Sequence, residues 1–200
     1  MSIIIPPPPG NRIGLLGGSF NPAHDGHLHI TELAIKHLEL DRVMWMVSPQ
    51  NPLKPTENMA PFHERMNHAE HISKRNPKII VSDVESKLGT NHTIDLLNEF
   101  KTRFPAIGFV WVMGADSMME FDQWKDWQAI FKMLPIAIFA RSDYSEKVET
   151  CVAAQHFADS KIDASGSADL VTMTAPAWVS LDTEIHSESS TRIRAETENT

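Results

Sequence analysis

The sequence predicts a single α/β domain with a Rossmann-like, doubly wound parallel sheet and helices on both faces. Short apolar runs that suit buried strands alternate along the chain with longer segments of helical periodicity. Such alternation implies parallel strands joined by right-handed crossovers. The length of 200 residues and the hydrophobic content of 42% are sufficient for one sizeable core.

The first strand and helix frame the most informative loop of the chain. The apolar run 12–16 ends at Gly17 and Gly18, which predicts a buried strand that enters a tight loop. A helix is expected to begin near Asp25, because apolar residues then recur at helical spacing. Its expected inward face consists of Ile30, Leu33, Ala34, His37 and Leu38.

Two more strands are expected in the first half of the chain, over 43–48 and 79–84. The Pro- and Asn-rich stretch 49–61 between them predicts a loop long enough to be functional. A helix over 62–75 follows the loop, with Pro61 at its first turn. Its expected inward residues are Phe62, Met66, Ala69 and Ile72.

The second half of the chain continues the alternation. The expected elements are a helix over 91–103, a strand over 108–113 ending at Gly114, a strand over 136–140, a helix over 145–157, a polar loop over 159–174, a strand over 178–181 and a last short helix beginning near Ser189. In such a sheet, ligands bind at the carboxyl ends of the strands, where the strand order reverses. The segments 17–27, 114–116 and 187–194 are therefore the expected binding region.

The ends of the chain are expected to lie outside the domain. We expect a flexible Pro-rich leader at 1–11, the domain at 12–195 and a tail at 196–200. The leader has no basic region and no apolar stretch long enough for a signal peptide or a membrane span. Cys151 is the one cysteine, which fits a reducing compartment, so a cytoplasmic protein is expected.

The charge balance limits the partners. Lys and Arg number 18 against 26 Asp and Glu, so the net charge is 18 − 26 = −8. A chain this acidic is not expected to bind nucleic acid or an anionic membrane. An anionic ligand would then need a local site, in which a few donors or positive charges are brought together.

The segment 17–27 has the properties of such a site. Gly17 and Gly18 allow the backbone to approach a ligand, and the amides at the start of the next helix favour a phosphate. His24 and His27 are three residues apart and can point at the same anion, while Gly26 leaves room beside the backbone. The alternative is an ordinary glycine turn with two surface histidines.

Three motifs together resemble one enzyme family. The segment 17–27 matches the H-x-G-H signature of nucleotidyltransferases, and its fuller form G-G-S-F-N-P-x-H-x-G-H is similar to bacterial nicotinate-nucleotide adenylyltransferases. The segment 189–194 matches S-x-T-x-I-R, and 114–124 matches G-x-D-S followed by F-x-x-W. The resemblance extends from Arg12 to Arg194.

The resemblance implies transfer of the adenylyl group of ATP to nicotinate mononucleotide, with Mg²⁺ carried by the ATP as the expected cofactor. It implies that His24, His27 and Arg194 are catalytic. The implied ATP site contains Gly17, Gly18, Ser19, Phe20, His24, Gly26, His27, Lys54, Gly114, Asp116, Ser189, Thr191 and Arg194. Three of these assignments have alternatives: Lys54 as a mobile surface lysine, Asp116 as a helix N-cap, and 189–191 as an ordinary Ser/Thr cap. Arg192 is left open between a phosphate contact and a solvated charge.

The resemblance also implies an acceptor site made of Ser19, Phe20, Thr93, Ile94 and Trp124. Trp124 would stack on the pyridine ring, and the amides of Thr93 and Ile94 would meet the nicotinate carboxylate. The alternative for Trp124 and Trp127 is a purely structural place in the core.

Other functions compete with this interpretation. A pantetheine-phosphate adenylyltransferase or a cytidylyltransferase would lack the Trp-bearing segment after Gly114, and 200 residues leave no room for an aminoacyl-tRNA synthetase. A nucleotide sensor without turnover is the alternative from another class. No protein-bound metal is expected, although His68 and His71 share one helix. The oligomeric state, a homo-oligomer included, is left open.

Overall fold

The computed structural model describes residues 10–50, 58–141 and 144–183. They form one six-stranded parallel sheet with the strand order β3-β2-β1-β4-β5-β6. The strands are β1 (Arg12–Gly18), β2 (Arg42–Val47), β3 (Ile79–Ser82), β4 (Gly108–Gly114), β5 (Ile136–Arg141) and β6 (Trp178–Thr183). The predicted Rossmann-like fold is confirmed, and the order of the strands reverses between β1 and β4.

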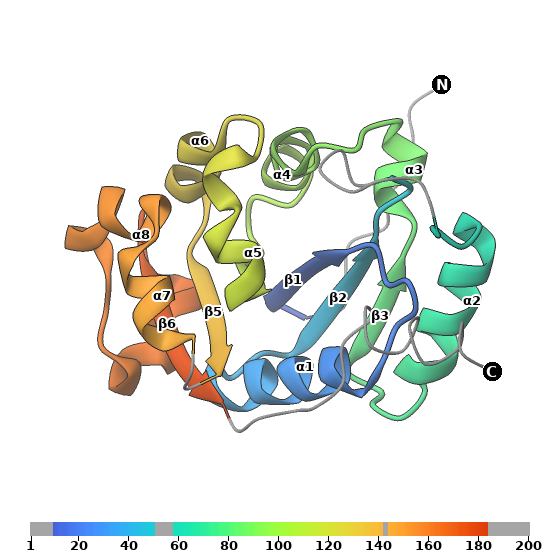
Figure 1. Cartoon of the computed structure of the whole chain (residues 1–200), viewed down its shortest axis with the longest axis horizontal. Coiled ribbons are helices and arrows are strands. Elements are labelled where there is room, and N and C mark those ends of the chain that lie inside the picture. Colours follow the sequence, from blue (N-terminus) through green and yellow to red (C-terminus); the bar gives the residue numbers. More distant parts are fainter. Residues whose placement is uncertain (1–9, 51–57, 142–143, 184–200) are drawn as a thin grey trace.

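Helices cover both faces of the sheet (Figure 1). The helices are α1 (Asp25–His37), α2 (Phe62–Ser73), α3 (Val84–Leu88), α4 (Thr93–Arg103), α5 (Ala115–Met119), α6 (Trp127–Met133), α7 (Ser145–Thr150) and α8 (Val152–His156). Short 3-10 turns are η1 (Phe121–Gln123), η2 (Ala158–Ser160) and η3 (Ala164–Thr172). None of the helices in the described part of the chain is long and apolar enough to cross a membrane.

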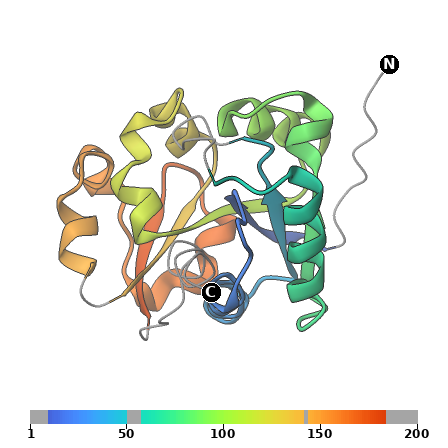
Figure 2. The ribbon, with the colours of Figure 1, turned by 45° about the vertical axis from the view of Figure 1, so that its right-hand side comes forward.

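The alternation of side chains along the strands produces two cores. Leu15 and Trp111 point to the face covered by α3 to α8. Leu16 and Trp45 point to the face covered by α1, α2 and η3. Figure 2 shows α1 and α2 next to one another on this second side. Each large side chain buried in this way contributes about 1.5–3 kcal/mol to folding.

The first strand and helix differ from expectation in two details. Gly17 and Gly18 belong to β1, where they lie beside Met46 and Val47 of β2, and do not form a loop. The inward face of α1 contains Thr31, whereas the predicted inward residue His37 is exposed. Thr31 can be buried because its hydroxyl accepts a hydrogen bond of 2.7 Å from Trp45 Nε1.

The region beyond β5 also differs. The helix expected over 145–157 is two helices, because the backbone of Cys151 is extended between α7 and α8. The expected polar loop over 159–174 contains η3, which Asp163 caps by accepting the N–H of Ser165 at 2.8 Å. The short helices α3, α5 and α6 were not expected.

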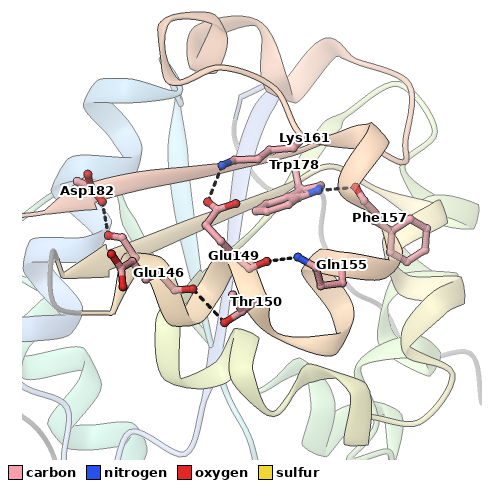
Figure 3. A network of polar contacts seen from close by, with 9 residues as sticks. Glu146, Glu149, Thr150, Gln155, Phe157, Lys161, Trp178 and Asp182 are labelled. Carbon is pink, nitrogen blue, oxygen red and sulfur yellow. Dashed lines mark hydrogen bonds and ion pairs between the residues drawn. The ribbon is translucent and has the colours of Figure 1, made fainter.

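The outer strand β6 is joined to α7 and α8 by polar contacts (Figure 3). Trp178 Nε1 donates to the carbonyl of Phe157 at 2.8 Å, and Lys161 forms an ion pair with Glu149. Gln155 Nε2 donates to the carbonyl of Glu149 at 2.6 Å. Because β5 and β6 lie beyond β4 in the sheet, this network stabilises the edge remote from the reversal point.

Candidate active site

The carboxyl ends of β1 and β4 lie side by side at the reversal point, and both strands end in glycine. A side chain at Gly17 would place its Cβ 2.9 Å from Cη2 of Trp111, which is closer than atoms can pack. Gly114 ends β4 and is the N-cap of α5. The Trp111 ring therefore excludes a side chain at Gly17, whereas an added Cβ at Gly114 would lie 3.9 Å from Ile30 Cδ1, an ordinary contact distance.

His24 and His27 fix the start of α1 together. His24 is the N-cap, and its Nδ1 accepts the N–H of Gly26 at 3.0 Å. His27 Nδ1 accepts the N–H of His24 at 3.2 Å, which completes a capping box. A ring nitrogen that accepts carries no proton, so both neutral rings hold their proton on Nε2. The ring centroids are 4.0 Å apart, and the structure thus brings the two predicted residues together as donors.

Phe20 supports His27 from the interior. Its φ of +47° is unusual for a residue with a side chain, and its ring is only 2% exposed. The ring lies 4.7 Å from the His27 ring and stacks on Trp45 at 5.2 Å. Because the Phe20 side chain is buried, its ring is not exposed to a nucleotide. The role that the structure shows for this ring is to pack against His27.

Ser19 is buried directly after the end of β1. Its hydroxyl has no hydrogen-bond partner within the described part of the molecule, and its carbonyl accepts Arg65 Nη1 at 2.6 Å. A buried polar atom without a partner is uncommon in proteins. The Ser19 hydroxyl is therefore, among the described residues, a buried polar group without a partner at the end of β1.

Asp116 lies exposed in the first turn of α5, directly after β4. The N-cap of this helix is Gly114, so the structural alternative for Asp116, a helix N-cap, is wrong. A carboxylate at the carboxyl end of a strand next to the reversal point is placed to accept ribose hydroxyls.

Three of the predicted acceptor residues lie on α4 and in the segment after α5. Thr93 and Ile94 begin α4, where first-turn amides lack intrahelical acceptors. Trp124 is partly exposed and meets Trp111 edge to face, with centroids 6.0 Å apart. Lys125 approaches Asp95 of α4 at 3.4 Å, which draws the Trp124 segment toward the start of this helix.

The sequence did not point to three buried residues behind the site. Arg65 of α2 is 2% exposed and donates to backbone carbonyls of the loops after β1 and β2. Glu85 of α3 is 5% exposed, and its burial raises the pKa of the carboxyl to about 7, against the effect of a hydrogen bond with Ser48. Trp111 forms the wall between Gly17 and Trp124. The available signal for Arg65 was its place between Phe62 and Met66 on the inward side of the helix.

Several predicted residues lie outside the described ranges. They are Lys54, Ser189, Thr191, Arg192 and Arg194, together with the expected last helix, most of the leader and the tail. Within residues 10–50, 58–141 and 144–183, no three His, Cys, Asp or Glu side chains lie together in a way that could hold a metal ion.

Comparison with known proteins decides between the competing interpretations. The model of the cytidylyltransferase-like family matches residues 15–196. A protein of Parvibaculum lavamentivorans, named probable nicotinate-nucleotide adenylyltransferase, is 47% identical over 93% of this chain and 92% of its own length. A Caulobacter protein of the same name is 45% identical over 92% of this chain and 96% of its own length. The chain belongs to the nicotinate-nucleotide adenylyltransferase family.

A solved structure agrees with the family's fold. The Plasmodium falciparum nicotinic acid mononucleotide adenylyltransferase, complexed with NaAD, matches 92% of this chain and 82% of its own with a TM-score of 0.68. The two sequences are 20% identical, so this likeness concerns the fold. The family expected from the three motifs is confirmed by the two relatives of 47% and 45% identity.

Proposed function

We propose that this protein transfers the adenylyl group of ATP to nicotinate mononucleotide, giving deamido-NAD and pyrophosphate in NAD biosynthesis. An oxygen of the acceptor phosphate bonds to the α-phosphorus, and the bond from that phosphorus to the oxygen bridging to the β-phosphate breaks. Pyrophosphate leaves with the electron pair. Because the attacking phosphate is already an anion, no side chain has to act as a general base.

The reciprocal capping of α1 by His24 and His27 is the observation that carries the proposal. Both Nδ1 atoms accept backbone N–H groups, so both Nε2 atoms are donors held by the fold. Donors fixed in advance stabilise charge that develops on the α-phosphate without reorganising during the reaction. The first-turn amides of α1 add a positive end of a helix dipole.

The remaining ATP contacts follow the ends of the strands. Gly17, Gly18 and Gly114 let the nucleotide approach the backbone, Ser19 offers its buried hydroxyl, and Asp116 accepts the ribose hydroxyls. Lys54, Ser189, Thr191 and Arg194 are proposed to hold the leaving phosphates. Mg²⁺ arriving on ATP would neutralise phosphate charge when it is bound.

Acceptor recognition is proposed to depend on one ring and one helix terminus. Trp124 has one side packed on Trp111 and Phe121, and its partial exposure leaves indole surface for a pyridinium ring. The first-turn amides at Thr93 and Ile94 suit a carboxylate, because a helix N-terminus favours an anion. This arrangement favours nicotinate over nicotinamide. Ser19, which directly follows β1, is proposed to contact both ATP and the acceptor nucleotide.

Product analysis tests the reaction. The purified protein with Mg·ATP and nicotinate mononucleotide should form deamido-NAD and pyrophosphate in equal amounts. A nucleotide sensor would instead bind both compounds without forming either product. Such binding without turnover would contradict the enzyme proposal. The cytoplasmic location also remains a proposal, which fractionation of cells would test.

A further inference from the structure

Arg65 is a buried cation without an acidic partner. It projects from α2 and is 2% exposed. Among the residues that the structure describes, no carboxylate forms an ion pair with it. Burial lowers the pKa of its guanidinium, yet an arginine side chain stays charged in proteins. Burying a charge costs free energy unless the charge is hydrogen-bonded, so the partners of this guanidinium are informative.

All the hydrogen bonds that the guanidinium donates within the described residues go to backbone carbonyls, and its carbon Cζ lies 5.4 Å from the centroid of the Phe62 ring. Nε donates to Ala60 at 3.0 Å, and Nη2 donates to Pro49 at 2.7 Å. Nη1 donates to both Ser19 at 2.6 Å and Ser48 at 2.7 Å. Ser19 follows β1, Ser48 and Pro49 follow β2, and Ala60 precedes α2. One side chain thus joins the carboxyl ends of two neighbouring strands to the start of a helix.

A second set of hydrogen bonds closes this connection into a ring. The N–H of Ser48 donates to the carbonyl of Gly18 at 2.9 Å. On the other side, the N–H of Ala60 donates to Asn21 Oδ1 at 3.1 Å, and Asn21 Nδ2 donates to the carbonyl of Asn58 at 2.9 Å. The backbone from Gly18 to Asn21 is therefore fixed at both of its ends, by Arg65 and by Asn21.

Phe20 lies between these two fixed points. Its positive φ directs its ring toward His27, with ring centroids 4.7 Å apart. The Phe20 ring, which packs against His27, is thus positioned by the carbonyl of Ser19 on one side and by the side chain of Asn21 on the other. A displacement of the Ser19 carbonyl would pass to Phe20 and then to His27.

We propose that Arg65 is a positioning residue for adenylyl transfer, which acts through Ser19 and Phe20 to hold His27 Nε2 in place. This proposal rests on the proposed function, since it assigns His27 to the ATP phosphates. The guanidinium also places a positive charge behind the segment that follows β1, which favours a phosphate on the other side of that segment. Misplacing a reacting group by about 1 Å can cost a hundredfold in rate.

The variant Arg65→Lys tests the proposal, because lysine keeps the charge but cannot donate to the same four carbonyls. We expect kcat to fall roughly tenfold to a hundredfold, while KM for ATP and for nicotinate mononucleotide changes by less than about threefold. The control is Arg103→Lys, which alters a surface arginine of α4 paired with Glu99 and should leave kcat unchanged. Thermal unfolding of both variants gives the assay temperature at which each is folded.

A spectroscopic measurement separates positioning from activity. Nitrogen-15 spectra of the histidine rings, with His27 assigned by comparison with His27→Ala, should report a single tautomer protonated on Nε2 in the unliganded wild type. In Arg65→Lys the His27 signals should shift toward mixed tautomers. Unchanged His27 signals would overturn the proposal, and so would an unchanged kcat. If the wild-type protein formed no product, the proposed function would fail, whereas the spectra would still decide what Arg65 positions.

If Arg65→Lys did not fold, Asn21→Ala cuts the same ring at its other end. The same fall in kcat and the same shift of the His27 signals are then expected. A folded Asn21→Ala variant with wild-type kcat and wild-type His27 signals would contradict the positioning role.

Discussion

His27 Nδ1 accepts the backbone N–H of His24 at 3.2 Å, so the second histidine of the motif holds the residue that carries the first. His24 in turn caps α1 through the N–H of Gly26 at 3.0 Å. The two imidazoles thus use one nitrogen each to build the helix terminus. Their other nitrogens, both Nε2, are the donors of the proposed site. A substitution at either position therefore changes both the start of the helix and the site.

His27→Ala should therefore have a large kinetic effect and a small structural one. Removing one donor from developing phosphate charge should lower kcat by about 10²–10³. Loss of the capping bond should lower the free energy of unfolding by about 1 kcal/mol. His68→Ala, which alters an exposed histidine of α2, is the matched control. A kcat close to that of this control would show that His27 is only a cap.

Trp124→Ala should weaken binding of the acceptor and leave ATP binding unchanged. Loss of stacking on a cationic ring costs about 1–2 kcal/mol, so KM for nicotinate mononucleotide should rise roughly tenfold. Trp127→Ala is the control, because Trp127 packs against His156 and Phe157 on the far side of α6. If both variants had the same acceptor KM, the stacking role of Trp124 would be wrong.

Gly17→Ala tests the close approach between β1 and Trp111. The new Cβ would lie 2.9 Å from Cη2 of this buried ring, so the ring must move. Such overpacking should lower the free energy of unfolding by about 1–3 kcal/mol. At Gly166 the nearest atom to an added Cβ is 3.8 Å away, so Gly166→Ala should be neutral by comparison. Denaturant unfolding of the two variants measures the difference.

Glu85 should make the stability of the protein depend on pH. Its carboxyl has a pKa of about 7 in the folded protein against 4.5 ordinarily, because burial disfavours the charged form. Between these values the folded state binds more protons than the unfolded state, so stability is full below about pH 4.5 and falls as the pH rises to about 7. The loss should be roughly 3 kcal/mol.

The control for this pH dependence is Glu85→Gln, which keeps the shape of the side chain and cannot ionise. The difference in the free energy of unfolding between wild type and variant should change steeply from pH 4.5 to 7 and level off above it. A difference that stays constant across this range would contradict the burial effect at Glu85.

The sequence predicted those parts of the molecule that local patterns determine. Strands buried on both faces appear as continuous apolar runs, so the six strands and their parallel sheet could be expected. The histidine pair was found because both residues belong to one short segment. Thr31 was missed because its inward position depends on a distant indole, and the break at Cys151 has neither a glycine nor a proline to mark it. Arg65 was missed because a charged residue on a helix normally faces solvent, and its four carbonyl partners come from separate loops.

Acceptor selectivity tests the central claim most directly. With Mg·ATP, the rate of pyrophosphate release should be compared for nicotinate mononucleotide, nicotinamide mononucleotide and phosphopantetheine, each as kcat/KM. Because amide donors at the start of α4 can pair with both oxygens of a carboxylate, whereas the NH2 of a carboxamide cannot accept a hydrogen bond, nicotinate mononucleotide should be preferred by at least about a hundredfold. Equal or higher kcat/KM with either of the other two acceptors would contradict the assignment of the acceptor, and no release with any of the three would contradict adenylyl transfer itself.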